Sequence, residues 1–296
     1  MLLYRYFGSH AFETLKKAKL KTSRISDFND PFEFLFVPII RGEITPEAAR
    51  GALRLFHDNP ALLMEIFSNS PHYQQQPAQL TEEIIQQSLR NNQDWWIATI
   101  VKDWPVIKKG IKLPTIQRRR QVIDKELRAI CFSDADAVSR QNDILLWSHY
   151  TKGHKGVRIG FEFPKAIFQI VGMKYKMERV RVDVSFWLDD VLILKALEES
   201  ATVKSKAWEY EGEYRLFTKT GRCEPIEIQK CDSTTTVEHF LEFKREWVKT
   251  VDFGALYPEA EVQPFIELLK KEYPNAVCRK TEFHETEYAL EYKQIH

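Results

Sequence analysis

The sequence predicts an α+β protein with a mixed, largely antiparallel sheet core and a helical subdomain inserted into it. Short segments with strand-like alternation occur near the N-terminus and again after residue 127. Between Thr45 and Glu126, apolar residues instead recur at helical spacing. We therefore predict an α+β core domain formed by residues 1–44 and 127–296, and a helical insertion over residues 45–126.

Before the insertion, alternation predicts a strand over Leu2–Phe7, and Ser9 is positioned to cap a helix over His10–Leu20. A second strand is expected over Leu20–Ser23. The segment Asp27–Glu33 is typical of a turn, because its Asn and Asp side chains can bond neighbouring backbone amides and its proline fixes the exit. Within the insertion, helical periodicity covers Pro46–Phe56, Pro60–Phe67 and Leu80–Val101.

After the insertion, the pattern predicts strands and helices in alternation. Asp143 is expected to cap a helix that runs through Tyr150 and stops at Gly153. The predicted strands are Leu127–Ser133, Lys155–Phe163, Trp208–Phe217, Cys223–Ile228 and Ala276–Arg279, and the further predicted helices are Leu188–Glu198 and Pro258–Tyr273.

Composition excludes several classes of function. The 296 residues, 44% of them hydrophobic and 29% charged, are typical of a globular protein with a substantial core. A net charge of +1 gives no global argument for nucleic-acid binding. No apolar run approaches the roughly 20 residues of a membrane span, and the first residues lack the apolar core of a signal peptide. We therefore expect a cytoplasmic protein without a membrane partner.

Arg5 is the first candidate site residue. Alternation places it on the same side of its strand as Leu3 and Phe7. A charge among apolar neighbours must be paired or must face a site. The alternative is an edge strand from which Arg5 extends its charged end to solvent.

The predicted strand Trp208–Phe217 carries Glu209, Glu211, Glu213 and Arg215 on one face. Like charges at such positions destabilise a sheet. A solvated ladder of weak surface ion pairs tolerates them, whereas a cleft that uses carboxylates requires them. Residues two apart place their carboxyls on one side about 6–7 Å apart, which suits Glu211 and Glu213 to chemistry at a glycosidic carbon.

Other residues could complete such a site. Arg5 is suited to a phosphate or a ribose through its planar fork, and Ser133 to a hydrogen bond with the leaving base or the ribose. Tyr150 or Trp147 could stack on a flat ring.

Two rival chemistries have weaker support. A metal site would use His149 and His154, but their spacing of five does not align them on one helical face. A cysteine nucleophile would be Cys131, which lies among apolar residues where a thiol is usually inert. No metal ligands are therefore assigned.

The motifs resemble a known family. They are Tyr4-Arg5-Tyr6, Phe28-Asn29-Asp30-Pro31-Phe32-Glu33, Cys131-Phe132-Ser133, Leu146-Trp147-x-x-Tyr150-x-x-x-His154-x-Gly156, Gly160-Phe161-Glu162 and Trp208-x-Tyr210-Glu211-x-Glu213-x-Arg215. In this order, they are similar to those of a bacterial domain-of-unknown-function family, number 2971.

The layout also resembles, more weakly, the ADP-ribosyltransferase-like fold. This resemblance implies NAD as co-substrate, with Arg5 contacting NAD, Ser133 supporting the nicotinamide ribose and Tyr150 stacking on nicotinamide. Trp147 and His154 complete the expected cofactor-binding set. Glu213 would bond the ribose hydroxyl and stabilise the oxocarbenium ion, while Glu211 would orient or deprotonate the acceptor.

The expected function is therefore cleavage of NAD at the nicotinamide–ribose bond, with transfer of ADP-ribose to a protein, a nucleic acid or water. By analogy, such a chain resembles a bacterial toxin or phage-defence effector. One alternative is a non-catalytic nucleic-acid- or protein-binding module that uses Arg118-Arg119-Arg120 and Lys16-Lys17-Ala18-Lys19. Another is a metal-dependent nuclease that uses His149 and His154.

Overall fold

The computed structural model describes residues 1–33, 37–39, 42–58, 60, 64, 81–110, 121, 124–134, 140–164, 170–183, 199–229 and 234–296. The chain folds into two compact units. The first consists of Met1–Glu33, Asp124–Met177 and Lys204–His296, and the second of Phe34–Ile123 and Glu178–Val203. The predicted helix Leu188–Glu198, most of Pro60–Phe67 and the run Arg118-Arg119-Arg120 lie outside the described residues.

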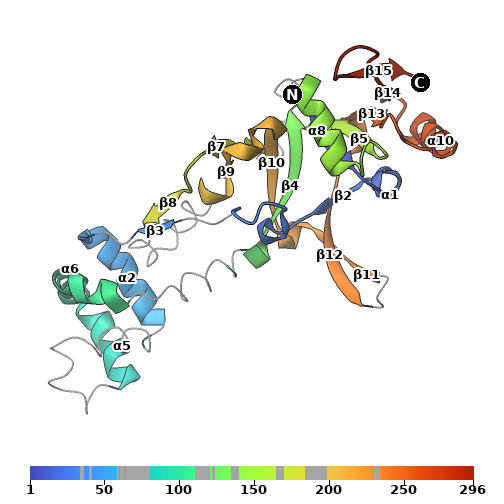
Figure 1. Cartoon of the computed structure of the whole chain (residues 1–296). Coiled ribbons are helices and arrows are strands. Elements are labelled where there is room, and N and C mark those ends of the chain that lie inside the picture. The colour runs from blue at the N-terminus through green and yellow to red at the C-terminus, as the bar shows by residue number, and fades with distance from the viewer. Residues whose placement is uncertain are drawn as a thin grey trace. The chain divides into compact units, whose positions relative to one another are not determined.

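The first unit is built around an eight-stranded sheet with the order β15-β14-β13-β5-β1-β4-β10-β6 (Figure 1). Its strands are β1 (Leu3–Phe7), β4 (Leu127–Asp134), β5 (Val157–Phe161), β6 (Ile170–Gly172), β10 (Glu213–Lys219), β13 (Val248–Phe253), β14 (Val277–Phe283) and β15 (Leu290–Gln294). Neighbours are antiparallel except β13 and β14. The parallel pair is joined through helix α10 (Val262–Glu272), as a crossover requires. The predicted α+β class with a mostly antiparallel sheet is confirmed.

Smaller elements complete this unit. A three-stranded sheet has the order β11-β12-β2, and β7 pairs with β9. These strands are β2 (Lys19–Thr22), β7 (Lys174–Lys176), β9 (Val203–Ser205), β11 (Glu224–Gln229) and β12 (Thr235–Glu242). The other helices are α1 (Ala11–Lys17) and α8 (Arg140–Tyr150), with short 3-10 helices η1 (Ile25–Asp27), η3 (Lys206–Glu211), η4 (Thr220–Arg222), η5 (Arg245–Trp247) and η6 (Glu259–Glu261).

The two faces of the large sheet differ in polarity. Cross-strand partners share a face, so Leu3, Ile159 and Val251 belong to the buried apolar face. Helices α1 and α10 contribute to the same core, where Phe265 meets Phe12 with ring centres 5.0 Å apart. The opposite face carries Tyr6, which bonds to α8. This face also carries Glu213 and Arg215 of β10, which are in register with Ser133 and Cys131 of β4. Arg5 is instead in register with Ile159 and so starts from the apolar side of β1.

Several predicted element bounds are wrong. Helix α1 ends at Lys17, before the predicted Leu20, because Ala18 adopts a left-handed conformation with φ 51°. Its N-cap is His10, without a side-chain cap, rather than Ser9. Asp143 lies inside α8 rather than at its cap, because its carboxylate accepts a hydrogen bond from Tyr6 at 2.7 Å and pairs with Arg158 at 3.2 Å.

The second unit has its own helical core. Helices α2 (Pro46–Asp58), α5 (Glu82–Asn91) and α6 (Gln93–Gly110) bury Phe56, Ile100 and Trp104. The single helix predicted over Leu80–Val101 is divided at Asn92. Asn92 is the C-cap of α5, and its backbone N–H donates to the Ser88 carbonyl. Strands β3 (Val37–Ile39) and β8 (Arg181–Asp183) pair in parallel. The three helices fall within the predicted range 45–126, while the unit also includes residues 34–44 and 178–203.

No helix among the described residues is both long enough and apolar enough to cross a membrane.

Candidate functional site

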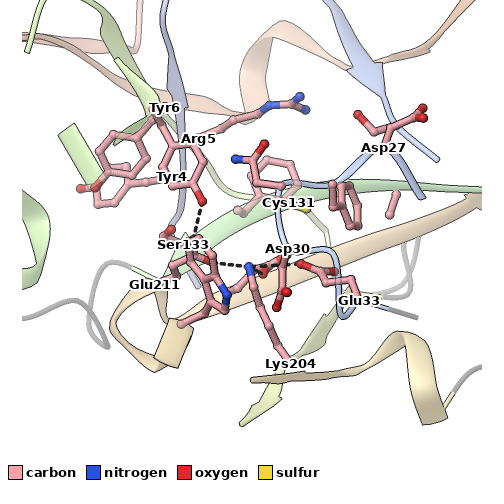
Figure 2. Close-up of a pocket in the computed structure, with 18 residues that line it drawn as sticks. Tyr4, Arg5, Tyr6, Asp27, Asp30, Glu33, Cys131, Ser133, Lys204 and Glu211 are labelled. Carbon is pink, nitrogen blue, oxygen red and sulfur yellow. Dashed lines mark hydrogen bonds and ion pairs between the residues drawn. The ribbon is translucent and has the colours of Figure 1, made fainter. Parts of the chain in front are cut away.

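A pocket of about 260 Å³ opens where β1 and β4 separate. The two strands pair only at Leu3 with Asp134 and at Tyr4 with Ser133, and further along β4 the backbone of Ala129 bridges to Ser23 instead. The pocket is lined from β1, β4, β10, α8 and η3, and by the segment that follows β2 (Figure 2). It therefore lies entirely within the first unit.

The structure brings five of the seven predicted site residues to this pocket. Arg5, Ser133, Tyr150, Glu211 and Glu213 all line it. Pairing of β4 with β1 and with β10 sets Tyr4, Ser133 and Glu213 side by side across three strands. Residues from β1, β4, α8, η3 and β10 therefore converge on one cavity.

The predicted strand Trp208–Phe217 is only partly a strand, which corrects the sequence interpretation. Residues Lys206–Glu211 form the 3-10 helix η3, Gly212 turns the chain with φ 50°, and β10 begins at Glu213. Ser205 caps η3, its hydroxyl accepting from the Ala207 amide at 3.4 Å. Glu209 is consequently exposed and does not share a strand face with Glu213.

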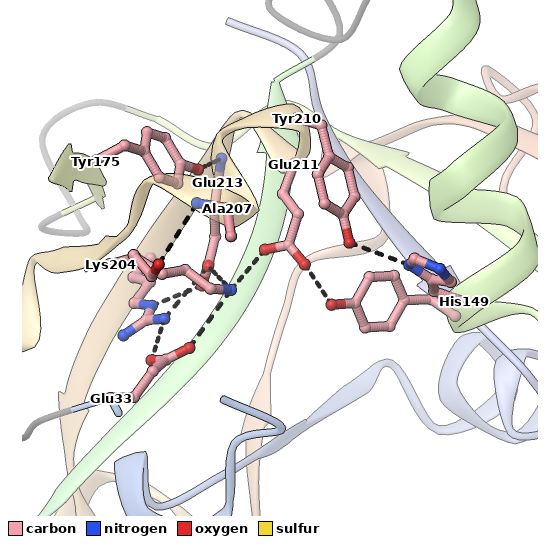
Figure 3. A network of polar contacts seen from close by, with 11 residues as sticks. Glu33, His149, Tyr175, Lys204, Ala207, Tyr210, Glu211 and Glu213 are labelled. Carbon is pink, nitrogen blue, oxygen red and sulfur yellow. Dashed lines mark hydrogen bonds and ion pairs between the residues drawn. The ribbon is translucent and has the colours of Figure 1, made fainter. Parts of the chain in front are cut away.

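Glu211 and Glu213 nevertheless meet at one cation, Lys204 (Figure 3). Lys204 Nζ lies 2.5 Å from Glu211 Oε2 and 2.8 Å from Glu213 Oε2. It also lies 3.4 Å from Glu33 Oε1. The ladder of solvated surface ion pairs is therefore wrong, because Glu211 and Glu213 are only 3% and 4% exposed.

Arg215 completes this cluster, which consists of Glu33, Lys204, Glu211, Glu213 and Arg215. The Arg215 guanidinium donates to Glu213 from Nε at 2.6 Å and from Nη2 at 3.2 Å, and it also bonds to Glu33. All five side chains are buried. When every group is ionised, three carboxylates face two cations, so the cluster carries one surplus negative charge.

The two central carboxyls differ in acidity. Burial opposes ionisation of Glu213, but Arg215 and Lys204 outweigh it and hold the pKa of this carboxyl at about 2. Burial raises the pKa of Glu211, and repulsion from Glu213 adds to this, while Lys204 acts in the opposite direction. Burial likewise raises the pKa of Glu33. Glu213 therefore stays ionised, and Glu211 takes up a proton more readily.

Helix α8 supplies the hydroxyl that contacts Glu211. The Tyr150 hydroxyl donates to Glu211 Oε1, and burial raises the pKa of Tyr150, with the Glu211 charge adding to the effect. One residue earlier, His149 Nδ1 lies 3.1 Å from the Tyr210 hydroxyl (Figure 3). Tyr150 thus ties α8 to η3 across the pocket.

Arg5 lines the pocket without a charged partner among the described residues. Its side chain extends from β1 toward the side where Asp27 lies (Figure 2), and its Nη1 atom is buried with no hydrogen-bond partner among the described residues. Burial lowers the pKa of Arg5 to about 10, although the Cys131 thiol acts in the opposite direction. Arg5 lies on a central strand and is partly buried, so the expected alternative of an edge strand is wrong. Within the part of the chain that the structure describes, no ion pair of Arg5 is found.

Trp147 and His154 do not line the pocket. Trp147 is fully buried and donates to the Tyr292 hydroxyl at 3.0 Å, and its ring stacks on His154 with 6.5 Å between centres. They lie beside a second cluster, in which Arg158 pairs with Asp252 at 2.8 Å and Arg279 pairs with Asp252 at 2.6 Å. Both rings therefore lie outside the pocket lining, and their expected contact with NAD stays a prediction.

The rival chemistries lose their supporting geometry. His154 Nε2 lies 3.0 Å from Ser148 Oγ, so it and His149 bind different partners. Among the described residues, no three or more His, Cys, Asp or Glu side chains are arranged to hold a metal ion. Burial raises the pKa of Cys131 well above its usual value, which disfavours a thiolate.

The basic segment near α1 is largely paired with carboxylates. Lys17 lies 3.4 Å from Glu13, and Lys19 pairs with Glu224. Arg118-Arg119-Arg120, the other support for nucleic-acid binding, lies outside the described residues.

The pocket residues that sequence reasoning did not assign to the site include Lys204, Glu33 and Asp30. Glu33 and Asp30 belong to the segment predicted as a turn, and the Asp30 carboxylate does bond the Phe32 amide at 2.9 Å. The motif that contains both residues was the available signal. Lys204 had no such signal, because an isolated lysine before a strand is usually solvated.

Comparison with known proteins adds one finding. No curated protein and no solved structure matches the chain. Residues 146–216, the segment that carries Tyr150, Lys204, Glu211 and Glu213, match the model of the family described as Protein of unknown function (DUF2971), as the motifs predicted.

Proposed function

We propose that this protein is an ADP-ribosyltransferase-type enzyme that cleaves NAD at the nicotinamide–ribose bond and passes ADP-ribose to a macromolecule or to water. One observation carries the proposal. Five residues that the resemblance assigns to NAD chemistry line a single pocket, next to a carboxylate cluster with surplus negative charge. Such a charge stabilises the positive ribosyl centre that forms when a glycosidic bond breaks.

In this proposal, the bond between ribose C1′ and the nicotinamide nitrogen breaks heterolytically. The electron pair leaves with nicotinamide, which becomes neutral, and positive charge develops on C1′ and the ring oxygen. Glu213, held ionised by Arg215 and Lys204, bonds the ribose hydroxyl and stabilises this charge. Ser133, in register beside Glu213, supports the same ribose.

The second half of the reaction needs an acceptor and a base. A lone pair of the acceptor forms the new bond to C1′, and the acceptor proton passes to Glu211. The pKa of Glu211 is raised by burial, which brings this carboxylate closer to the range of an effective general base. Tyr150 orients Glu211 through its hydroxyl and presents its ring to nicotinamide, while Arg5 binds a phosphate.

The test measures nicotinamide release from NAD by the purified full chain, alone and with total cell RNA, DNA or protein as acceptor. We expect release by the wild type and a loss of at least about 100-fold in Glu213→Gln. Glu211→Gln is expected to lose transfer to the acceptor more than hydrolysis. Glu209→Gln is the matched control, because Glu209 is an exposed glutamate of the same η3 segment.

Folding must be separated from catalysis in this test. Near-ultraviolet circular dichroism of each variant shows whether tertiary packing is retained. Absence of release by the folded wild type with every acceptor would overturn the proposal, as would full activity of folded Glu213→Gln. A toxin or defence role predicts growth arrest when the wild type is expressed in bacteria, relieved by Glu213→Gln.

A further inference from the structure

Two buried polar atoms in the pocket lack hydrogen-bond partners among the described residues. They are Arg5 Nη1, a donor, and Asp30 Oδ2, an acceptor. The other described side chains with such atoms, His154, Thr236 and Thr250, do not line the pocket. Buried polar groups in folded proteins are nearly always paired, and each exception needs an explanation. Here one cavity holds two exceptions of opposite polarity.

Asp30 is held in a fixed orientation. Its Oδ1 atom accepts from the Phe32 amide at 2.9 Å, within the turn that follows η1. The residue is only 5% exposed, so water does not freely replace the missing partner of Oδ2. Oδ1 of Asp30 thus stabilises the turn, whereas Oδ2 remains available to accept a hydrogen bond from a ligand.

Arg5 and Asp30 do not satisfy each other. No described ion pair or hydrogen bond joins them, although both line the same cavity. The other acidic residues that line the pocket are Asp27, Glu33, Glu211 and Glu213. The last three are paired with Lys204 and Arg215, and Asp27 is exposed to solvent. The pocket therefore lacks one anionic group for Arg5 and one hydrogen-bond donor for Asp30.

The remaining lining suits a ligand with a flat ring. Tyr4, Phe28 and Trp208 contribute aromatic side chains to the pocket. A nucleotide combines a phosphate, a flat base and hydroxyl or amino donors in one molecule. We propose that Asp30 is the hydrogen-bond acceptor that recognises a donor group of a nucleotide whose phosphate binds Arg5. The inference deepens the proposed function, on which it rests for the identity of the ligand.

Binding tests the inference independently of catalysis. Isothermal titration calorimetry of the full chain compares two pairs of probes, and the members of each pair differ only by a phosphate. The first pair is AMP and adenosine, and the second is nicotinamide mononucleotide and nicotinamide riboside. In at least one pair, the phosphate-bearing probe should bind more tightly. Arg5→Gln should weaken that probe about tenfold or more and leave its phosphate-free counterpart within about twofold, since a hydrogen bond to a charged group is worth at least that much.

Asp30→Asn keeps the acceptor for the Phe32 amide but presents an N–H₂ donor in place of Oδ2. It should weaken both members of the pair about tenfold or more, because two donors would then face each other. Asp94→Asn is the matched control, since Asp94 is an exposed aspartate that does not line the pocket, and its affinities should stay within about twofold of wild type.

Thermal unfolding without ligand gives a second readout. A residue kept for a ligand costs stability, so Arg5→Gln and Asp30→Asn should unfold at or above the wild-type temperature. The inference is overturned if the wild type binds none of the probes, if Asp30→Asn binds them like wild type, or if Asp30→Asn lowers the unfolding temperature while affinity is retained. Nucleotide binding without nicotinamide release would instead overturn only the proposed function.

Discussion

Replacing Glu213 with glutamine tests how the buried charges are arranged. The folded-state pKa of Glu213 is about 2, against an ordinary carboxyl value of 4.5. This difference of about 2.5 corresponds to about 3 kcal/mol, at about 1.36 kcal/mol for each pKa unit. Relief of repulsion with Glu211 offsets part of the loss. We therefore expect Glu213→Gln to lower the free energy of unfolding at pH 7 by about 2 to 3 kcal/mol.

The neighbouring carboxylate should behave differently. Burial raises the pKa of Glu211, so its ionised form opposes folding rather than supporting it. Glu211→Gln removes the surplus negative charge and leaves two carboxylates with two cations. Its free energy of unfolding should therefore stay within about 1 kcal/mol of wild type at pH 7. The contrast between these two substitutions is specific to the cluster geometry.

The pH dependence follows from the direction of the Glu213 shift. Because its folded pKa is lowered, its contribution is complete above the unfolded value of 4.5 and is lost as the pH falls toward 2. Urea unfolding, with hydrogen exchange of the β4 and β10 amides as a local probe, measures the difference between wild type and variant over this range. Equal losses in both glutamine variants, or a difference that does not shrink at low pH, would refute the charge assignment.

Three further predictions concern other contacts. Tyr150→Phe removes the hydroxyl that lowers the pKa of Glu211, so carboxyl ¹³C NMR should show this pKa rising above its wild-type value. Gly160→Ala would place a Cβ 2.4 Å from Thr250 Oγ1 and 2.9 Å from Tyr4 Cε1. Urea unfolding should therefore show that the free energy of unfolding falls by about 1–3 kcal/mol. Gly221→Ala is the control, because no atom lies near its Cβ position, and its free energy of unfolding should stay within about 0.5 kcal/mol of wild type. In the second unit, Phe56→Ala should cost about 3–5 kcal/mol in the same assay because its ring is fully buried, whereas Ile84→Ala, at a half-exposed position, should cost much less.

Much of the first unit was predictable where one local pattern decides the structure. Strands were expected over Leu2–Phe7 and Leu127–Ser133, and Leu3–Phe7 and Leu127–Asp134 form central strands of the sheet. The predicted helix Pro258–Tyr273 and strand at Ala276 correspond to η6, α10 and β14, which follow β13. Periodicity reports which side of an element is buried, and these segments bury one side against a single core.

The errors have two sources: tertiary contacts that override the local pattern, and local signals that alternation does not report. Asp143 has the residue type and position of a helix cap, but Arg158 and Tyr6 bind its carboxylate from the sheet. The Glu211-x-Glu213 spacing is compatible with a strand, which is why a strand was predicted there. Ser205, a residue type that caps helices, and Gly212, which tolerates a positive φ, were the sequence signals for the short helix η3 and the turn after it. Alternation could not predict the contacts of Asp143, because Tyr6 and Arg158 come from distant segments.

The candidate site shows the same limit more sharply. Pattern reasoning placed Glu211 and Glu213 together but could not supply their cation, because Lys204 reaches them from β9 rather than from a spacing in the motif. Arg5 was predicted by a different test, namely a charge on a strand face with apolar neighbours and no obvious partner. The same criterion, a buried polar atom without a hydrogen-bond partner among the described residues, also identifies Asp30 Oδ2 in the same cavity. A charge in a cavity that the described residues leave unpaired is therefore a better guide to a binding residue here than a carboxylate motif, since the carboxylates of the motif are satisfied within the fold.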